Sequence, residues 1–181
     1  MRMTRFLAPA AILLTTACGD QLFPASIDNV EEEVILGSLT STPLSIPSGY
    51  SIPDARAVRT EISSAFDFAY VVNSEGQHFL VPLDALGLGS SGFNPGLIRS
   101  EVTFEAIEEA PVNGYTTSDS VAVAVGDVLV ARSRIVCSLG VPQYVKLEVL
   151  EINVDLNTIR LRTMPNVNCG FRALMPGIPT S

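Results

Sequence analysis

Hydrophobic and polar residues alternate through much of the chain, which is the period of a β-strand with one buried face. The clearest alternating run covers residues 144–152, and a second covers 158–164, with the polar segment 153–157 between them. Two such runs joined by a short polar turn predict a β-hairpin. The charged residues expected on its outer side are Lys146, Glu148, Arg160 and Arg162. Opposite charges would then pair across the two strands for a few tenths of a kcal/mol each.

Shorter alternating runs predict further strands, and convincing helix signals are scarce. The best helix signal is residues 82–86, which is enough for one turn. The runs expected to be strands are Phe66-Phe68-Tyr70-Val72, Val102-Phe104-Ala106, and Val121-Val123-Val125 followed after Gly126-Asp127 by Val128-Val130. We therefore predict an all-β fold, either an antiparallel sandwich or a partly open barrel. Residues 128–136, 144–152 and 158–164 would form a C-terminal three-strand meander.

Three segments have the composition of loops. Residues 37–53 are rich in Ser, Thr, Pro and Gly, and further long loops are expected at 84–100 and 108–118. Binding sites on β-sandwiches are commonly built from loops. The 84–100 loop contains Phe93, Leu97 and Ile98, which could close on a ligand or could simply cap the core.

Cys137 and Cys169 are expected to form a disulfide. They follow the first and third strands of the predicted meander, which run parallel and therefore end on the same side. Those two strands would stand about 10 Å apart, so cysteines in the loops beyond them could meet. Such a bond would contribute about 3–4 kcal/mol by limiting the unfolded chain. A zinc site is the alternative, but it needs two more ligands and His78 is the only histidine.

The amino terminus has the pattern of an export signal. Arg2 and Arg5 are followed by a short apolar stretch and by small residues up to Ala17, so 1–17 is predicted to be a signal peptide. Cys18 then resembles the lipidated cysteine of bacterial lipoproteins, although Thr15 stands where that motif usually has Leu. We expect a lipid at Cys18, a tether over 18–33 and one β domain over 34–181. An ordinary secretory signal is the alternative.

The residue after Cys18 bears on which membrane would hold the lipid. Gly19 takes this place. In enteric bacteria an Asp there resembles an inner-membrane retention signal, so its absence favours the outer membrane.

Composition limits the partners. The chain has 181 residues, of which 47% are hydrophobic and 17% charged, enough apolar material for a folded core. The formal net charge of −8 becomes −10 if Arg2 and Arg5 leave with the signal peptide. Such an acidic surface repels phosphate backbones, so nucleic acid is not an expected partner. The expected partners are the membrane, through the lipid, and an envelope protein or a small ligand.

No enzyme motif occurs in a supporting context. Residues 87–92 match GxGxxG but lack the βαβ frame that would bind a dinucleotide. A Ser–His pair would have to use His78, and the adjacent Glu108-Glu109 lacks the opposed geometry of an acid–base pair. We therefore expect no enzymatic activity, no metal site and no resident cofactor. A hydrolase with an unfamiliar site is the remaining enzymatic alternative.

Several short motifs, spread over about 100 residues, resemble the HmuY-like family of bacterial haem-binding lipoproteins. They are 66–70 (FDFAY), 73–76 (NSEG), Ser91-Gly92, Phe104, Ala110-Pro111, Gly114-Tyr115, Asp119 and 144–149 (YVKLEV). The resemblance implies an all-β, lipid-anchored domain that holds haem through axial side chains, typically histidines. The candidate axial ligands here are His78, Met164 and Met175, because methionine also ligates haem iron.

The sequence therefore leaves three functions in order of preference. The first is a non-catalytic, lipid-anchored β domain that binds a ligand or partner at the cell envelope. The second is a structural envelope lipoprotein without a small ligand. The third is a haem-binding lipoprotein.

Overall fold

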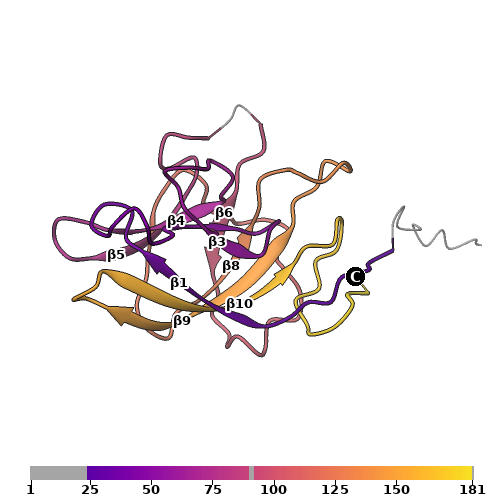
Figure 1. The fold of residues 1–181 in the computed structure, drawn as a ribbon. Coiled ribbons are helices and arrows are strands. Elements are labelled where there is room, and N and C mark those ends of the chain that lie inside the picture. The colour runs from indigo at the N-terminus through magenta and orange to yellow at the C-terminus, as the bar shows by residue number, and fades with distance from the viewer. Residues whose placement is uncertain (1–23, 90–91, 181) are drawn as a thin grey trace, which may run out of the picture.

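The structure, a computed structural model, describes residues 24–89 and 92–180, which form ten strands and no helix. The strands are β1 (Glu32–Gly37), β2 (Gly49–Ser51), β3 (Arg56–Val58), β4 (Phe68–Val72), β5 (His78–Pro82), β6 (Gly96–Arg99), β7 (Val121–Ala122), β8 (Val128–Arg132), β9 (Tyr144–Asn153) and β10 (Thr158–Asn166). They build two antiparallel sheets (Figure 1), a first sheet β1-β10-β9-β8-β6 and a second sheet β3-β2-β4-β5-β7. The prediction of an all-β sandwich is confirmed, and the sheets do not close into a barrel.

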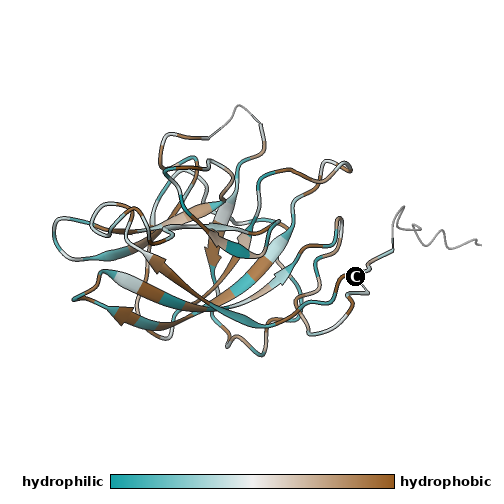
Figure 2. Cartoon of the chain, in the orientation of Figure 1, coloured by the Kyte–Doolittle hydropathy of each residue, from teal (hydrophilic) through white to brown (hydrophobic). Residues whose placement is uncertain are grey.

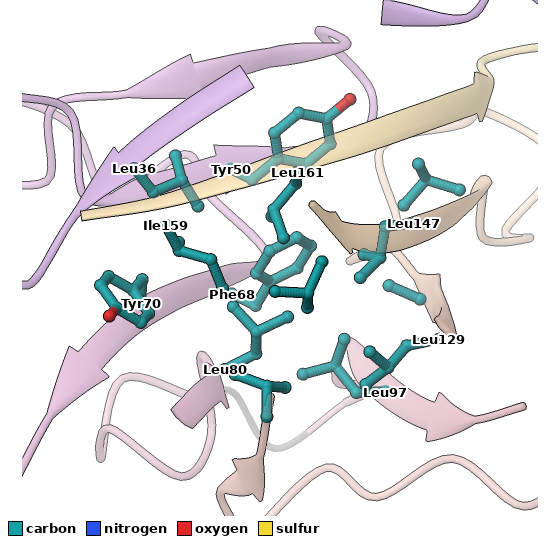
Figure 3. Close-up of a cluster of buried hydrophobic side chains, with 14 of the residues drawn as sticks. Leu36, Tyr50, Phe68, Tyr70, Leu80, Leu97, Leu129, Leu147, Ile159 and Leu161 are labelled. Atoms are coloured by element: carbon teal, nitrogen blue, oxygen red, sulfur yellow. The ribbon is translucent and has the colours of Figure 1, made fainter. Parts of the chain in front are cut away.

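The main core lies between the two sheets (Figure 3). Leu129, Leu147 and Leu161 reach it from the first sheet, and Phe68 and Leu80 reach it from the second. Each of these side chains is at most 1% exposed. Full burial of such a side chain contributes about 1.5–3 kcal/mol, so the alternating apolar positions account for the pairing of the sheets.

The predicted meander is confirmed, because β9 lies between β8 and β10. Hydrophobic and hydrophilic residues, drawn in brown and teal in Figure 2, alternate along both strands of the β9–β10 hairpin. Its turn ends at Asn157, whose φ is 51°, and the ladder has an irregularity between Arg160 and Leu161. This irregularity fixes the register in which Glu148 lies opposite Arg162.

The predicted disulfide is also present. Cys137 follows β8 and Cys169 follows β10, and the bond joins Cα atoms that are 5.9 Å apart. This separation lies within the range of about 4.4–6.8 Å found for disulfides. The bond connects the loops beyond the two outer strands of the meander, as the sequence predicts.

Asp67 connects the two sheets through polar contacts inside the core region. It precedes β4 and is 1% exposed. Its carboxylate accepts hydrogen bonds from the backbone N–H of Ile52 and of Arg134, each at 2.7 Å, and the Arg134 guanidinium lies at 3.1 Å. Burial raises the pKa of Asp67, while the contacts with Arg134 act against that rise. Removing this carboxylate would leave several donors without an acceptor.

Two of the predicted loops contain strands. Segment 37–53 includes β2, which lies inside the second sheet with Tyr50 fully buried. Segment 84–100 includes β6, where Leu97 is 1% exposed and lies opposite Ala131. These strands have three and four residues, which is too short for a period of two to stand out. The composition of these two segments therefore predicts loops and not strands.

One predicted strand is wrong. Residues 103–106 form a turn, with Phe104 2% exposed and Val102 51% exposed. Phe104 packs in a second apolar cluster with Ile107, Val130 and others. The alternation Val102-Phe104-Ala106 arises because a single side chain of this turn is buried, and no partner strand is involved.

The two chain ends of the described domain lie side by side (Figure 1). Asn29 and Gly177 exchange backbone hydrogen bonds of 2.9 and 3.1 Å. The Asn168 side chain accepts from the backbone N–H groups of Ser26 and Ile27, at 3.0 and 3.1 Å. The amino-terminal segment, expected from sequence to be a tether up to residue 33, is thus held against the domain from Ser26 onward, and β1 begins at Glu32.

Candidate functional site

The first sheet has an outer face, which is the side pointing away from the main core. Alternation sends Leu129 and Ala131 inward and Val130 and Arg132 outward, and it places Lys146 and Arg162 on the same outer face. Coil segments that contain Phe104, Ile107, Ala110 and Leu174 cover part of this face with the second apolar cluster. The outer face is therefore a partly covered surface with three cationic side chains in its floor.

Lys146 is buried on the outer face, which corrects the expectation that it faces solvent. It is the only lysine of the chain and is 2% exposed. Its ammonium donates to the Ile107 carbonyl at 2.9 Å and lies 4.6 Å from the centre of the Phe104 ring. Loss of hydration lowers the pKa of Lys146. Because the turn at 103–106 folds over it, this lysine connects the covering coil to the sheet, and its opposite residue across the hairpin is the uncharged Met164.

Arg162 is satisfied by carboxylates. It pairs with Glu31 at 2.7 Å, with Glu105 at 2.6 Å and with Glu148 at 3.3 Å. The pairing with Glu148 confirms one of the predicted cross-strand pairs. Arg160 pairs instead with Glu33 and Glu151. Hydrogen bonds from Arg162 hold the pKa of Glu31 and of Glu105 below their ordinary values.

Arg132, at the end of β8, lies where two loops meet. Its guanidinium carbon is 4.2 Å from the centre of the Phe93 ring and 4.9 Å from the centre of the Tyr115 ring. Phe93 comes from segment 84–100 and Tyr115 from segment 108–118, the two loops that the sequence marks as possible binding loops. We call Arg132, Phe93, Tyr115 and the adjacent Tyr144 the arginine cage.

The backbone brings these loops together at Gly96. Leu97 and Thr116 exchange backbone hydrogen bonds of 3.0 and 2.8 Å. A Cβ atom at Gly96 would lie 2.9 Å from the Thr116 carbonyl oxygen and 2.9 Å from Cβ of Tyr115. Glycine therefore allows the close approach that sets Tyr115 beside Arg132.

Within the described chain, the guanidinium of Arg132 has neither a carboxylate partner nor a hydrogen bond, and its Nε atom is buried without an acceptor. Loss of hydration lowers the pKa of Arg132. Burial raises the pKa of Tyr115 and of Tyr144, so neither phenol supplies a negative charge at neutral pH. The cage is thus a cationic site without a counter-ion in an acidic chain.

The two candidate methionine ligands come together, and the histidine does not join them. Met164 and Met175 line a groove of about 240 Å³ with Phe104, Lys146 and Arg162. His78 lies in the second sheet, where its ring accepts or donates a hydrogen bond with the Tyr70 hydroxyl at 2.7 Å. Burial raises the pKa of Tyr70 to about 12, so this hydroxyl stays protonated at neutral pH.

Among the described residues, no group of three or more His, Cys, Asp or Glu side chains is placed to hold a metal ion. No helix in the described ranges is long and apolar enough to cross a membrane. Cys18, the expected lipid site, and the predicted signal peptide lie outside the described residues.

Sequence reasoning named the loops of the cage but not its central residue. Arg132 follows an apolar strand, where a single arginine usually marks the strand end. What distinguishes it is the absence of a carboxylate partner, which depends on contacts between segments far apart in the chain. The sequence singles out Phe93 as a loop residue, and it includes Tyr115 and Tyr144 among the short motifs of the family resemblance.

Comparison of the chain with protein-family models, with curated proteins and with solved structures finds no match. The resemblance to the HmuY-like family therefore remains a prediction from short motifs.

Proposed function

We propose that the protein is a lipid-anchored domain of the cell envelope that binds a ligand or a protein partner, without catalysis, at the arginine cage. One observation carries the proposal: Arg132 is half-buried and uncompensated, and it packs against aromatic rings from two loops. A desolvated cation costs free energy unless it gains a partner. Binding from outside the chain would supply one.

The rest of the outer face supports a binding role over a catalytic one. Lys146 is closed off by its contacts with Phe104 and Ile107, and Arg162 is occupied by three carboxylates. Neither side chain is free to act on a substrate. Of these three cations on the described outer face, Arg132 is the one whose guanidinium makes no hydrogen bond to the protein.

The test is site-specific photo-crosslinking in the cells that make the protein. A photoreactive amino acid replaces Val112, which is 58% exposed in the loop of Tyr115, and in a matched control it replaces Ile62, which is 73% exposed beside the second sheet. We expect a discrete adduct from position 112, its loss when Arg132→Gln is added, and no such adduct from position 62. An adduct that does not depend on Arg132, or none at position 112, would contradict binding at the cage.

The lipid anchor is tested separately by Cys18→Ser. We expect the protein to leave the membrane fraction, because the acyl chains supply most of the attachment. Unchanged retention in the membrane would show that another anchor holds it.

The two other functions make different predictions. A structural envelope lipoprotein would give no Arg132-dependent adduct. A haem site at the two methionines meets a size problem, because a groove of about 240 Å³ is smaller than the roughly 300–1,000 Å³ of small-molecule sites. The ligand is placed at the cage because of the uncompensated charge of Arg132, and not because of the volume of a cavity.

A further inference from the structure

We infer that the arginine cage binds the carboxylate group of an organic acid, with Arg132 receiving the carboxylate and the rings of Phe93 and Tyr115 contacting the apolar part. This inference rests on the proposed function and adds the chemical class of the ligand. The contacts of Arg132, the pairing of the other arginines and the local charge each support it.

The donors of Arg132 are the first argument. A guanidinium has five N–H donors in one plane, and their spacing matches the two oxygens of a carboxylate. The Arg132 guanidinium lies over the Phe93 and Tyr115 rings, and this stacking leaves its N–H donors free of hydrogen bonds to the rings. Aromatic contact also limits the rotamers of a long side chain, so less conformational freedom is lost when a planar partner binds.

The other arginines give the second argument. Among the described residues, carboxylates pair with six arginines: Arg59, Arg99, Arg134, Arg160, Arg162 and Arg172. Arg56 has no carboxylate partner but is exposed to water. Of the eight arginines that the structure describes, Arg132 alone combines partial burial with the absence of a carboxylate partner. In a chain with 19 acidic residues and 11 basic ones, such an arginine is available to an acid from outside.

Charge balance favours a carboxylate over a phosphate. A carboxylate brings one negative charge and matches the single positive charge of Arg132, whereas a phosphate group brings about 1.5 to 2 negative charges at neutral pH. Arg172, which together with Arg132 acts electrostatically on Tyr115 and Tyr144, is already paired with Glu109 at 3.1 Å. The excess charge of a phosphate would therefore remain uncompensated beside an acidic surface. Tyr144, whose ring centre is 6.4 Å from that of Tyr115, extends the aromatic surface for the apolar part of the acid.

Tyrosine fluorescence offers a direct measurement, since the chain has no tryptophan and two of its four tyrosines belong to the cage. The mature chain, purified in a neutral detergent, is titrated with benzoate, with the uncharged isostere benzamide and with inorganic phosphate. We expect a saturable change with benzoate alone. Arg132→Gln should raise the apparent Kd for benzoate about tenfold or more, a difference of about 1.4 kcal/mol. Arg56→Gln, the exposed control, should leave it unchanged.

Each other outcome overturns the inference in a distinct way. Arg132-dependent binding of phosphate but not benzoate would assign the cage to another anion. Equal binding of benzamide would show that the rings alone hold the ligand. A benzoate signal that survives Arg132→Gln would place binding elsewhere, and no signal at all would remove the carboxylate class. If Arg132→Gln fails to fold, Arg132→Lys serves, because it keeps the charge but loses the bidentate geometry. The crosslinking experiment judges the proposed function independently of all these results.

Discussion

Single residues of this fold differ most from expectation where a charged side chain is buried. Alternation correctly places Lys146 on the side of β9 opposite the core, but alternation does not say whether that side meets water. The covering turn at Phe104 is formed by residues about 40 positions earlier in the chain, so its effect on Lys146 is a tertiary one. The environment of Arg132 cannot be predicted for the same reason, because contacts between distant loops place Phe93 and Tyr115 beside it and no local pattern indicates those contacts.

Asp67 allows a prediction at this scale. Asp67→Asn should lower the free energy of unfolding by about 2–4 kcal/mol, because the amide accepts fewer of the hydrogen bonds from Ile52 and Arg134. Denaturant unfolding measures the change. Asp155→Asn, in the exposed β9–β10 turn, is the matched control and should have little effect.

The pH dependence of the same variant has a defined sign. Burial raises the pKa of Asp67 in the folded protein, so the folded state keeps its proton to higher pH than the unfolded state does. The stability owed to this group is therefore fully present below the unfolded pKa of about 3.9. It falls as pH rises through the folded pKa. We expect the stability difference between wild type and Asp67→Asn to shrink over that range, and a difference that grows with pH would contradict the burial argument.

At the scale of elements, the long strands could be predicted and the short ones could not. The β9–β10 hairpin has ten and nine residues, enough for alternation and a polar turn to specify it. β2 and β6 are recognisable only through the neighbours they pair with. The disulfide was predictable because the meander itself brings the ends of β8 and β10 to the same side.

Removing that disulfide tests the meander. Replacing both Cys137 and Cys169 by Ser should lower the free energy of unfolding by about 3–4 kcal/mol. This is the entropy of the unfolded chain that is regained when two residues 32 positions apart are no longer cross-linked. In denaturant unfolding, the reduced wild-type protein should show the same decrease in the free energy of unfolding as the double variant. If the double variant matches oxidised wild type, the bond does not constrain the unfolded chain.

At the scale of the whole molecule, the two chain ends complete the domain together. Asn168 holds Ser26 and Ile27, and Asn29 pairs with Gly177. The first of these segments is expected from the sequence to be a tether. Its order depends on side-chain amides that hydrogen-bond to irregular backbone, and such contacts leave no periodic signal.

Asn168→Ala should free the amino-terminal segment. Hydrogen exchange at the amides of Ser26 and Ile27 should accelerate, because both lose their acceptor, while the β9 amide of Leu147 should keep its protection. Unchanged exchange at Ser26 and Ile27 would show that other contacts hold the segment.

The attachment of Ser26 to Asn168 also has a geometric consequence for a lipidated chain. Ser26 lies eight positions after Cys18, and eight residue steps span at most about 29 Å even when fully extended. A lipid at Cys18 would thus restrain the orientation of the domain on the bilayer as well as its position. The C-terminal segment that pairs with Asn29 would face the lipid surface, and the β9–β10 turn, at the other end of the molecule (Figure 1), would point away from it.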